Sequence, residues 1–278
     1  MTFLRKLRED AGNNKIFYAA LVLLVLMIAI ALFPGIFAIS NPADQNMSVL
    51  LQKPSLAHPF GTDNFGRDIM SRVIYGARID LMIGFIATLV PFLFGSVVGL
   101  LAGYCGKNVD AVIMRVLDVM SAFPFIVLVI LIVTILGTGI RNLYIAIWLV
   151  GWREYAKLVR SEVMVEKNAE YVQAARVLGF SNARIMLRHI LPNVIGSALV
   201  YGISDIMLCM LMAASMSFLG LGVQPPTSEW GAMISEGRPY LTYAWWIASF
   251  PGLALALTGI SISLVGNGLS RKLGLKSR

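Results

Sequence analysis

Residues 81–106 read LMIGFIATLVPFLFGSVVGLLAGYCG and contain no Asp, Glu, Lys or Arg. A helix that crosses a bilayer needs about 20 predominantly apolar residues, so this stretch is long enough to span a membrane. Further charge-free stretches are residues 16–43, 119–140, 142–152, a stretch after Pro192 interrupted only by Asp205, and 241–270. The sequence therefore predicts an all-α integral membrane protein with six transmembrane helices.

The composition agrees with a membrane protein. Of the 278 residues, 58% are hydrophobic and 14% are charged, whereas soluble domains average roughly 45–50% apolar and about 25% charged residues. A water-soluble globule is excluded, and the chain leaves no room for a separate catalytic domain. The two cysteines, Cys105 and Cys209, lie in apolar stretches, so neither a disulfide framework nor a cysteine-rich metal site is expected.

The net charge of +8 is best explained by membrane topology. With both termini inside, 17 of the 23 Lys and Arg residues fall on inner segments, as the positive-inside rule requires. No nucleic-acid partner is therefore needed to explain the charge.

The expected segments are a basic cytoplasmic segment at 1–15, a first helix at 16–37, an extracytoplasmic segment at 38–80, a five-helix domain at 81–268 and a cytoplasmic tail at 269–278. In this topology His58 and His189 lie on opposite sides, and no set of catalytic groups converges, so we do not expect an enzyme.

Glycines recur at helical spacing within residues 81–106. Gly95, Gly99 and Gly103 are four residues apart and share one helix face. Small residues on one face let two helices approach closely. The partner could be a helix of another subunit or of this chain, and we favour packing within the chain.

The largest inner loop has the pattern of a helix, a sharp turn and a second helix. Residues 169–178 are good helix formers, Gly179 is placed to end the helix in a left-handed conformation, and Ser181 can cap the next helix. We call residues 167–192 the elbow. Val172, Ala175 and Leu178 would form a small apolar face able to enter a groove on a soluble partner.

The elbow resembles the cytoplasmic loop of the inner-membrane permease subunits of ABC importers. That loop reads Glu-Ala-Ala, three residues, Gly, nine residues, Ile, one residue, Leu-Pro. Gln173 stands here where Glu is usual, and His189 where Ile is usual. The ATPase-coupling residues that the resemblance implies are Glu170, Gln173, Ala174, Ala175, Gly179, Leu191 and Pro192.

Other segments resemble the peptide and nickel importer branch of this family, in particular its second permease. They are residues 58–68 (HPFGTDNFGRD), 114–118 (MRVLD), 122–124 (AFP), 217–222 (SFLGLG) and 224–231 (QPPTSEWG). The resemblance implies a type I ABC importer transmembrane domain in the bacterial cytoplasmic membrane, forming half of a pathway for dipeptides or oligopeptides. Nickel or a metal chelate is the alternative substrate.

The resemblance also implies partners: a homologous permease, two ATPase subunits, an extracytoplasmic substrate-binding protein and membrane lipids. The residues agree on one point, because the chain contains no Gly-x-x-x-x-Gly-Lys-Ser/Thr phosphate loop. We therefore expect no cofactor on this chain, with ATP and Mg bound by the ATPase subunits. A secondary transporter would show inverted repeats and several intramembrane charges, and neither is visible.

Asp205 is the carboxylate that lies well inside a predicted span, where ionisable residues are expensive and usually functional. Cys209 is four residues further on and shares its face. The pair could line the transport pathway, either as ligands of a soft metal ion or with Asp205 paired to a cation.

A charged run outside the membrane and one aromatic residue complete the candidates. The charged run could contact the binding protein or an outer gate, or it could be a solvated loop with internal ion pairs. The aromatic residue could belong to a gate or merely anchor its loop at the membrane interface. These residues are Asp63, Arg67, Asp68, Arg72 and Trp230.

Overall fold

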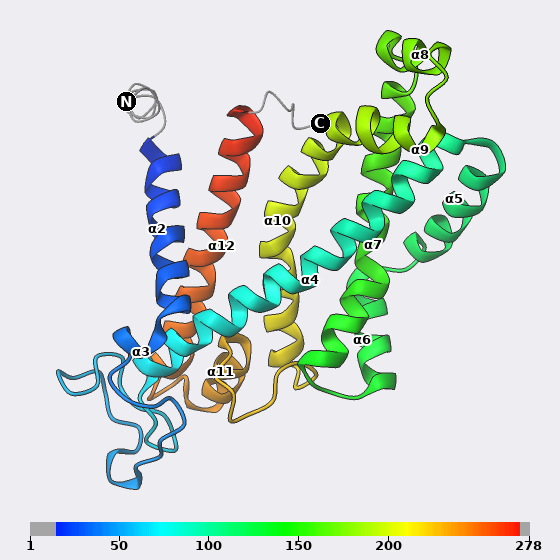
Figure 1. Cartoon of the computed structure of the whole chain (residues 1–278). Coiled ribbons are helices and arrows are strands. Elements are labelled where there is room, and N and C mark those ends of the chain that lie inside the picture. Colours follow the sequence, from blue (N-terminus) through cyan, green and yellow to red (C-terminus); the bar gives the residue numbers. More distant parts are fainter. Residues whose placement is uncertain (1–14, 273–278) are drawn as a thin grey trace.

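A computed structural model describes residues 15–272, and in this part of the chain helices are joined by loops without any β-strand (Figure 1). An isolated bridge joins Thr62 to Asp68. The predicted all-α fold is confirmed. Residues 1–14 and 273–278, which hold most of the predicted cytoplasmic N-terminal segment and tail, lie outside the described part. The helices are α2 (Lys15–Leu32), α3 (Pro34–Phe37), η1 (Met47–Val49), α4 (Ile69–Cys105), α5 (Lys107–Ser121), α6 (Phe125–Leu136), α7 (Ile140–Glu166), α8 (Glu170–Val177), α9 (Asn182–Arg184), η2 (Ile185–Ile190), α10 (Leu191–Phe218), α11 (Trp230–Gly237), η3 (Arg238–Tyr240) and α12 (Trp246–Lys272).

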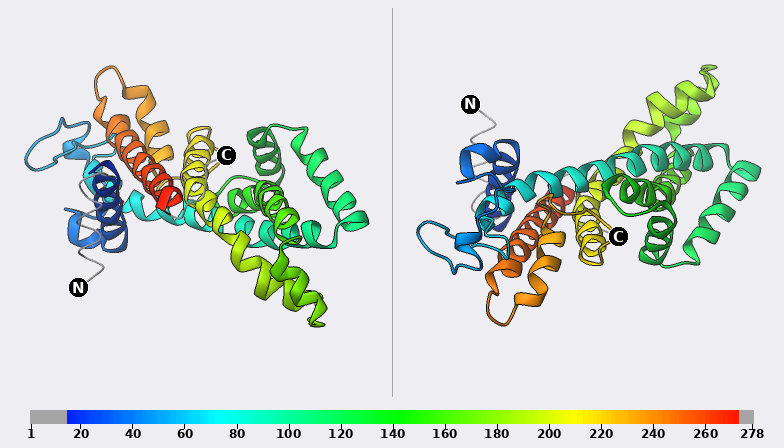
Figure 2. Two further views of the ribbon diagram at one scale, coloured as in Figure 1. Left: turned by 90° about the horizontal axis from the view of Figure 1, so that it is seen from above. Right: turned by 90° about the horizontal axis from the view of Figure 1, so that it is seen from below.

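The bundle has two different ends. The elbow, with α8 and α9, projects from one end, and residues 38–68 lie with α11 at the other, which we call the loop end (Figure 1). The 37-residue helix α4 runs obliquely between the two ends. Seen along the bundle, α2 and α12 lie toward one side, and α5 and α6 toward the other (Figure 2).

Helix α4 begins earlier than the charge pattern predicts. The Asp68 carboxylate caps it by accepting a hydrogen bond from the Ser71 backbone N–H at 2.7 Å, so the helix starts at Ile69 rather than near residue 81. Residues 69–80 of the predicted extracytoplasmic segment 38–80 are thus helical, and the position of that segment relative to the membrane stays a prediction. Arg72 and Asp80 interrupt the apolar run but are buried within the chain, so a search for charge-free stretches misses this part of the helix.

Fewer helices qualify as membrane spans by length and composition than the six that the sequence predicts. Within residues 15–272, four helices are long and apolar enough to cross a membrane: α2, α4, the continuous helix Asn182–Phe218 and α12. The bent pair α5 and α6 brings the number to as many as five. Helix α7 is 27 residues long but carries charges from Arg153 onward. Six spans therefore stay a prediction.

The predicted helix over residues 119–140 is broken. Helices α5 and α6 meet at an angle of 84° around residues 122–124, where Pro124 lacks the N–H that a continuous helix would use. Two side chains of α7 hold the break: the Arg153 guanidinium donates to the Met120 carbonyl at 2.7 Å, and the Lys157 ammonium to the Ser121 hydroxyl at 2.7 Å.

The glycine face of α4 packs against α7 within the chain, as we favoured from the sequence. A Cβ added to Gly95 would lie 2.4 Å from the Trp152 carbonyl oxygen, and one added to Gly99 would lie 2.5 Å from the Ala156 carbonyl oxygen. Because both obstacles are backbone atoms, the two helices can approach this closely only where α4 has no side chain.

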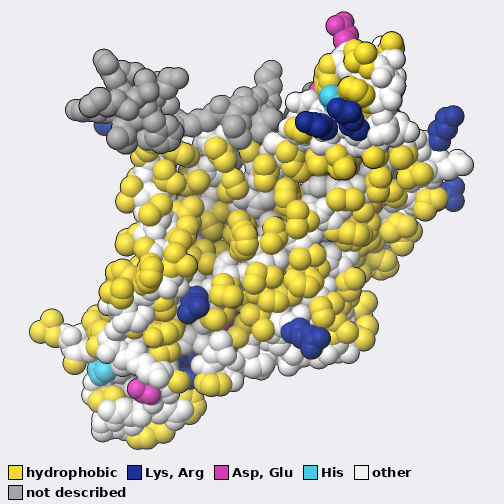
Figure 3. Space-filling view, in the orientation of Figure 1, with side chains coloured by type: hydrophobic (Ala, Val, Ile, Leu, Met, Phe, Trp, Pro, Cys, Tyr) yellow, Lys and Arg dark blue, Asp and Glu magenta, His cyan; other side chains and the backbone are white. Residues whose placement is uncertain are grey.

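Apolar side chains dominate the flank between the two ends (Figure 3). Many large ones are exposed along α2, α4, α6 and α10. A surface this apolar is unusual for a protein surrounded by water. It is suited to contact with lipid or with a second membrane subunit.

We expect Gly99→Ala to destabilise the protein by about 1–3 kcal/mol, because the added methyl group would overlap the α7 backbone. The matched control is Gly252→Ala in α12, where the added Cβ meets only the end of the Ile234 side chain at 3.8 Å. Thermal unfolding of both variants in detergent measures the difference. Equal melting temperatures would contradict the proposed role of the close approach.

Candidate functional site

The elbow has the predicted helix, turn and helix. Helix α8 ends at Val177, and Gly179, two residues later, is in the left-handed region with φ of +77°; a Cβ added there would have nothing within 4 Å. Glycine is therefore favoured at this position by its backbone conformation rather than by crowding. The Ser181 hydroxyl then caps α9 by accepting from the Arg184 backbone N–H at 3.4 Å.

The apolar face of α8 turns inward, against our expectation. Val172 and Ala175 are buried in a cluster with Ile185 and Ile190 of η2 and with residues of α4, α7 and α10. They support the elbow and are not available to a partner. The apolar side chains left at the tip are Val177 and Leu178, which are 88% and 71% exposed.

The remaining elbow candidates lie on or near the surface. Ala174 is exposed, Leu191 is half-buried and Pro192 is exposed in the first turn of α10. Glu170 and Gln173 are also exposed, and the Gln173 amide donates to the Asn168 carbonyl at 3.0 Å. The structure thus brings the predicted motif together at one end of the molecule.

A cavity of about 400 Å³ lies between α4, α6, α7 and α10. Asp205 and Cys209 both line it, so the structure confirms that they share a face of α10 and places them at one cavity. Most of the lining is apolar, including Pro91 and Ile147.

Four further polar groups of the cavity were not predicted from the sequence: Arg153 and Glu154 of α7, and Tyr201 and Ser215 of α10. The Arg153 guanidinium donates to Glu154 Oε1 at 3.1 Å. The signal of these two α7 charges in the sequence is their position directly after the charge-free stretch 142–152.

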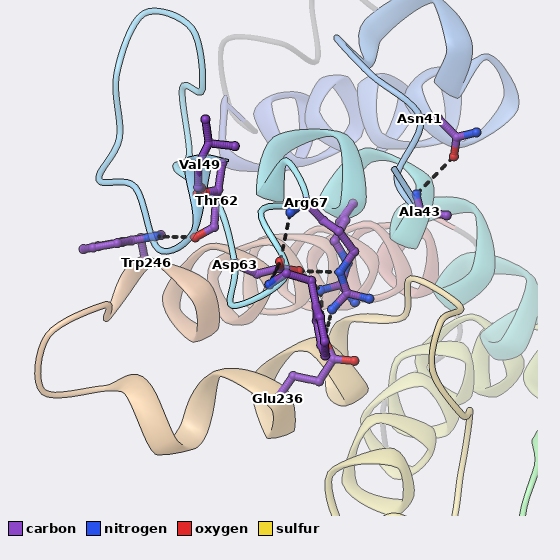
Figure 4. A network of polar contacts seen from close by, with 10 residues as sticks. Asn41, Ala43, Val49, Thr62, Asp63, Arg67, Glu236 and Trp246 are labelled. Carbon is purple, nitrogen blue, oxygen red and sulfur yellow. Dashed lines mark hydrogen bonds and ion pairs between the residues drawn. The ribbon is translucent and has the colours of Figure 1, made fainter. Parts of the chain in front are cut away.

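The loop end is held by a buried network of charges (Figure 4). Asp63 accepts hydrogen bonds from Arg67 at 2.6 Å and from Arg72 at 2.7 Å. Both arginines also bind the Glu236 carboxylate of α11, at 2.9 Å and 2.8 Å. The network therefore ties residues 62–72 to α11, far away in the sequence.

A second set of contacts fixes the start of α11. The Glu229 carboxylate accepts hydrogen bonds from the Gly231 and Ala232 backbone N–H groups at 3.0 and 2.7 Å, and burial raises its pKa. The Trp230 indole donates to the Val73 carbonyl at 3.0 Å, and its backbone N–H donates to Asp80.

The predicted charged run is therefore not an exposed surface. All five candidates at this end are nearly or fully buried: Asp63, Arg67, Asp68, Arg72 and Trp230. In this structure their side chains are out of reach of a binding protein, because their contacts lie within the chain. Of the alternative, the internal ion pairs are present, but they are buried rather than solvated. A part in an outer gate stays a prediction.

Comparison with known proteins places the chain in a transport family. The family model described as "Binding-protein-dependent transport system inner membrane component" matches residues 95–276. This range contains α7, the elbow and the whole of α10. The chain belongs to this family. It is thus an inner-membrane permease of the ABC importer type.

Two relatives align over nearly the whole chain. The dipeptide transport system permease protein DppC of Alkalihalophilus pseudofirmus is 41% identical over 99% of this chain and 90% of its own length. The di/tripeptide transport system permease protein DppC of Pseudomonas aeruginosa is 39% identical over 96% and 90%.

The fold is similar to that of a solved ABC transporter. A chain of the inward-facing MetNI methionine transporter superposes with a TM-score of 0.58 at 16% identity, covering 74% of this chain and 97% of that one. At this identity the likeness concerns the fold alone. It supports the type I importer fold.

We expect Asp63→Asn to destabilise the protein by about 3–5 kcal/mol, because Arg67 and Arg72 would lose a buried counter-charge. Asp44→Asn, in an exposed part of the same loop, is the control and should be neutral. Chemical denaturation followed by tryptophan fluorescence would measure both changes. A variant as stable as the wild type would show that the network does not hold the loop end.

Proposed function

We propose that this chain forms half of the translocation pathway of an importer for dipeptides or oligopeptides in the bacterial cytoplasmic membrane. The observation that carries the proposal is the match, at 41% and 39% identity over nearly the whole chain, to two permeases named for peptide transport. The cavity beside Asp205 would belong to this pathway.

The proposed assembly contains a second, homologous permease, two ATPase subunits and an extracytoplasmic substrate-binding protein. ATP and Mg would bind to the ATPase subunits, so this chain would be a non-catalytic subunit without a cofactor of its own. The elbow would dock on an ATPase through its exposed tip, which presents Ala174, Val177 and Leu178. The elbow and both termini would then be cytoplasmic, as the positive-inside rule predicts.

The packing beneath the elbow supports a mechanical role. Val172 and Ala175 share one apolar cluster with Leu100 of α4, Tyr155 of α7 and Val194 of α10. Because close-packed interiors transmit displacement, a movement of the elbow would reach α7 and α10, which line the cavity. ATP-driven closure of the ATPase pair would thereby open the pathway alternately to each side.

The alternatives have less support. Both relatives are named for peptides, not for nickel, and the described residues contain no group of three or more His, Cys, Asp or Glu able to hold a metal ion. Membership of the binding-protein-dependent transport family argues against a secondary transporter.

The direct test is uptake of radiolabelled dialanine by proteoliposomes that contain the complete importer. We expect uptake that requires both ATP inside the vesicles and the binding protein outside. Omitting this chain, with the other subunits present, should abolish it. An importer that hydrolyses ATP in response to its binding protein but takes up no di- or oligopeptide would contradict the peptide assignment.

Gly179→Val tests the elbow. The side chain would strain a left-handed residue by about 1–2 kcal/mol and distort the tip, so we expect ATPase binding and uptake to fall while the binding protein keeps its affinity for peptide. Gly220→Val is a matched control, because Gly220 has φ of +78° and equally open surroundings at the other end of the molecule. Equal loss of ATPase co-purification in both variants would contradict docking at the elbow.

A further inference from the structure

Asp205 stands out in the cavity because it lacks a counter-charge. Its Oδ2 atom accepts a hydrogen bond from the Tyr155 hydroxyl at 2.8 Å, and its Oδ1 atom has no hydrogen-bond partner within the described residues. No salt bridge joins Asp205 to another described side chain. A carboxylate within a membrane helix is costly unless a cation or hydrogen-bond donors compensate its charge.

Arg153 is the cation that lines the same cavity, but its side chain is already bound to other groups. Its guanidinium donates to Glu154 and to the Met120 carbonyl, and it also lies over the Phe125 ring at 5.6 Å. Arg153 therefore balances Glu154 and braces the break between α5 and α6. The charged lining of the cavity consists of two carboxylates and one guanidinium, so it is left with one negative charge at Asp205.

The surroundings of Asp205 match an organic cation better than a metal ion. The cavity lining also contains Glu154, Cys209 and Met212, but Glu154 is bound by Arg153, and the described residues contain no group of three His, Cys, Asp or Glu able to hold a metal ion. Aromatic rings are close instead: Tyr155 and Tyr201 pack edge to face with centroids 4.9 Å apart, and Tyr201 lines the cavity. Carboxylate oxygens and aromatic faces both attract ammonium groups.

We propose that the cavity binds the α-ammonium group of the transported peptide, with Asp205 as its counter-ion. This inference rests on the proposed function. The Asp205 Oδ1 atom would accept a hydrogen bond from the ammonium, and the Tyr155 hydroxyl would hold the carboxylate in place through Oδ2. Tyr155 is thus a positioning residue.

The rest of the cavity suits a variable side chain. Beyond the charged groups it is lined mainly by apolar residues such as Ile147, Leu208 and Met212. Its volume of about 400 Å³ lies at the lower end of the range for small-molecule sites, roughly 300–1,000 Å³. It is therefore suited to the amino-terminal part of a peptide, recognised by the ammonium that all unmodified peptides share.

Equilibrium binding to the importer without its binding protein tests this site separately from transport. The assembled permeases and ATPases would be placed in lipid nanodiscs and titrated with radiolabelled dialanine and N-acetyl-dialanine. We expect dialanine to bind the wild type about tenfold or more tightly, because acetylation removes the charge. Asp205→Asn should abolish this preference, whereas Asp205→Glu should retain part of it.

Asp118→Asn is the matched control, because Asp118 is exposed on α5 and does not line the cavity; it should keep the full preference. ATPase stimulation by the binding protein reports whether each variant has assembled. The proposal is overturned if the wild type binds neither probe or binds both equally, if Asp205→Asn keeps the preference, or if it weakens both probes alike. Peptide uptake by a wild type without any preference would retain the proposed function and reject the site.

Discussion

The close contact between α4 and α7 is the constraint on which the rest of the structure depends. At Gly95 and Gly99 the α4 backbone meets the carbonyl oxygens of α7 with no side chain between them. Helix α4 carries the buried charge network at one end and part of the packing beneath the elbow at the other. Helix α7 carries Arg153 and Glu154 into the cavity. The contact therefore sets the relative positions of all three regions.

Local sequence signals predicted the parts of the structure that depend on neighbouring residues. The left-handed turn at Gly179 and the cap at Ser181 follow from short-range backbone geometry, and both were predicted. The glycine spacing also indicated a tight helix contact, because four-residue steps define one helix face. The family resemblance then supplied the role of the elbow, which backbone geometry alone does not contain.

Other parts depend on contacts between distant residues, and these could not be predicted from one sequence. Arg72 and Glu236 are 164 residues apart, so the burial of the charged run follows only from the folded chain. The same holds for the start of α4, where the buried charge of Arg72 is compensated by Asp63 and Glu236. Likewise, the cavity needs α7 beside α10, and this arrangement brings Glu154 and Asp205 to one space.

The bracing of α5 has a mechanical consequence. This helix is joined to α4 at Gly106, forms an ion pair between Asp110 and Arg160 of α7 near its start, and is bound to α7 again at Met120 and Ser121 near its end. Helices α4, α5 and α7 are thus connected to one another at several points, so a displacement of α7 would be carried to α5 through both of its ends.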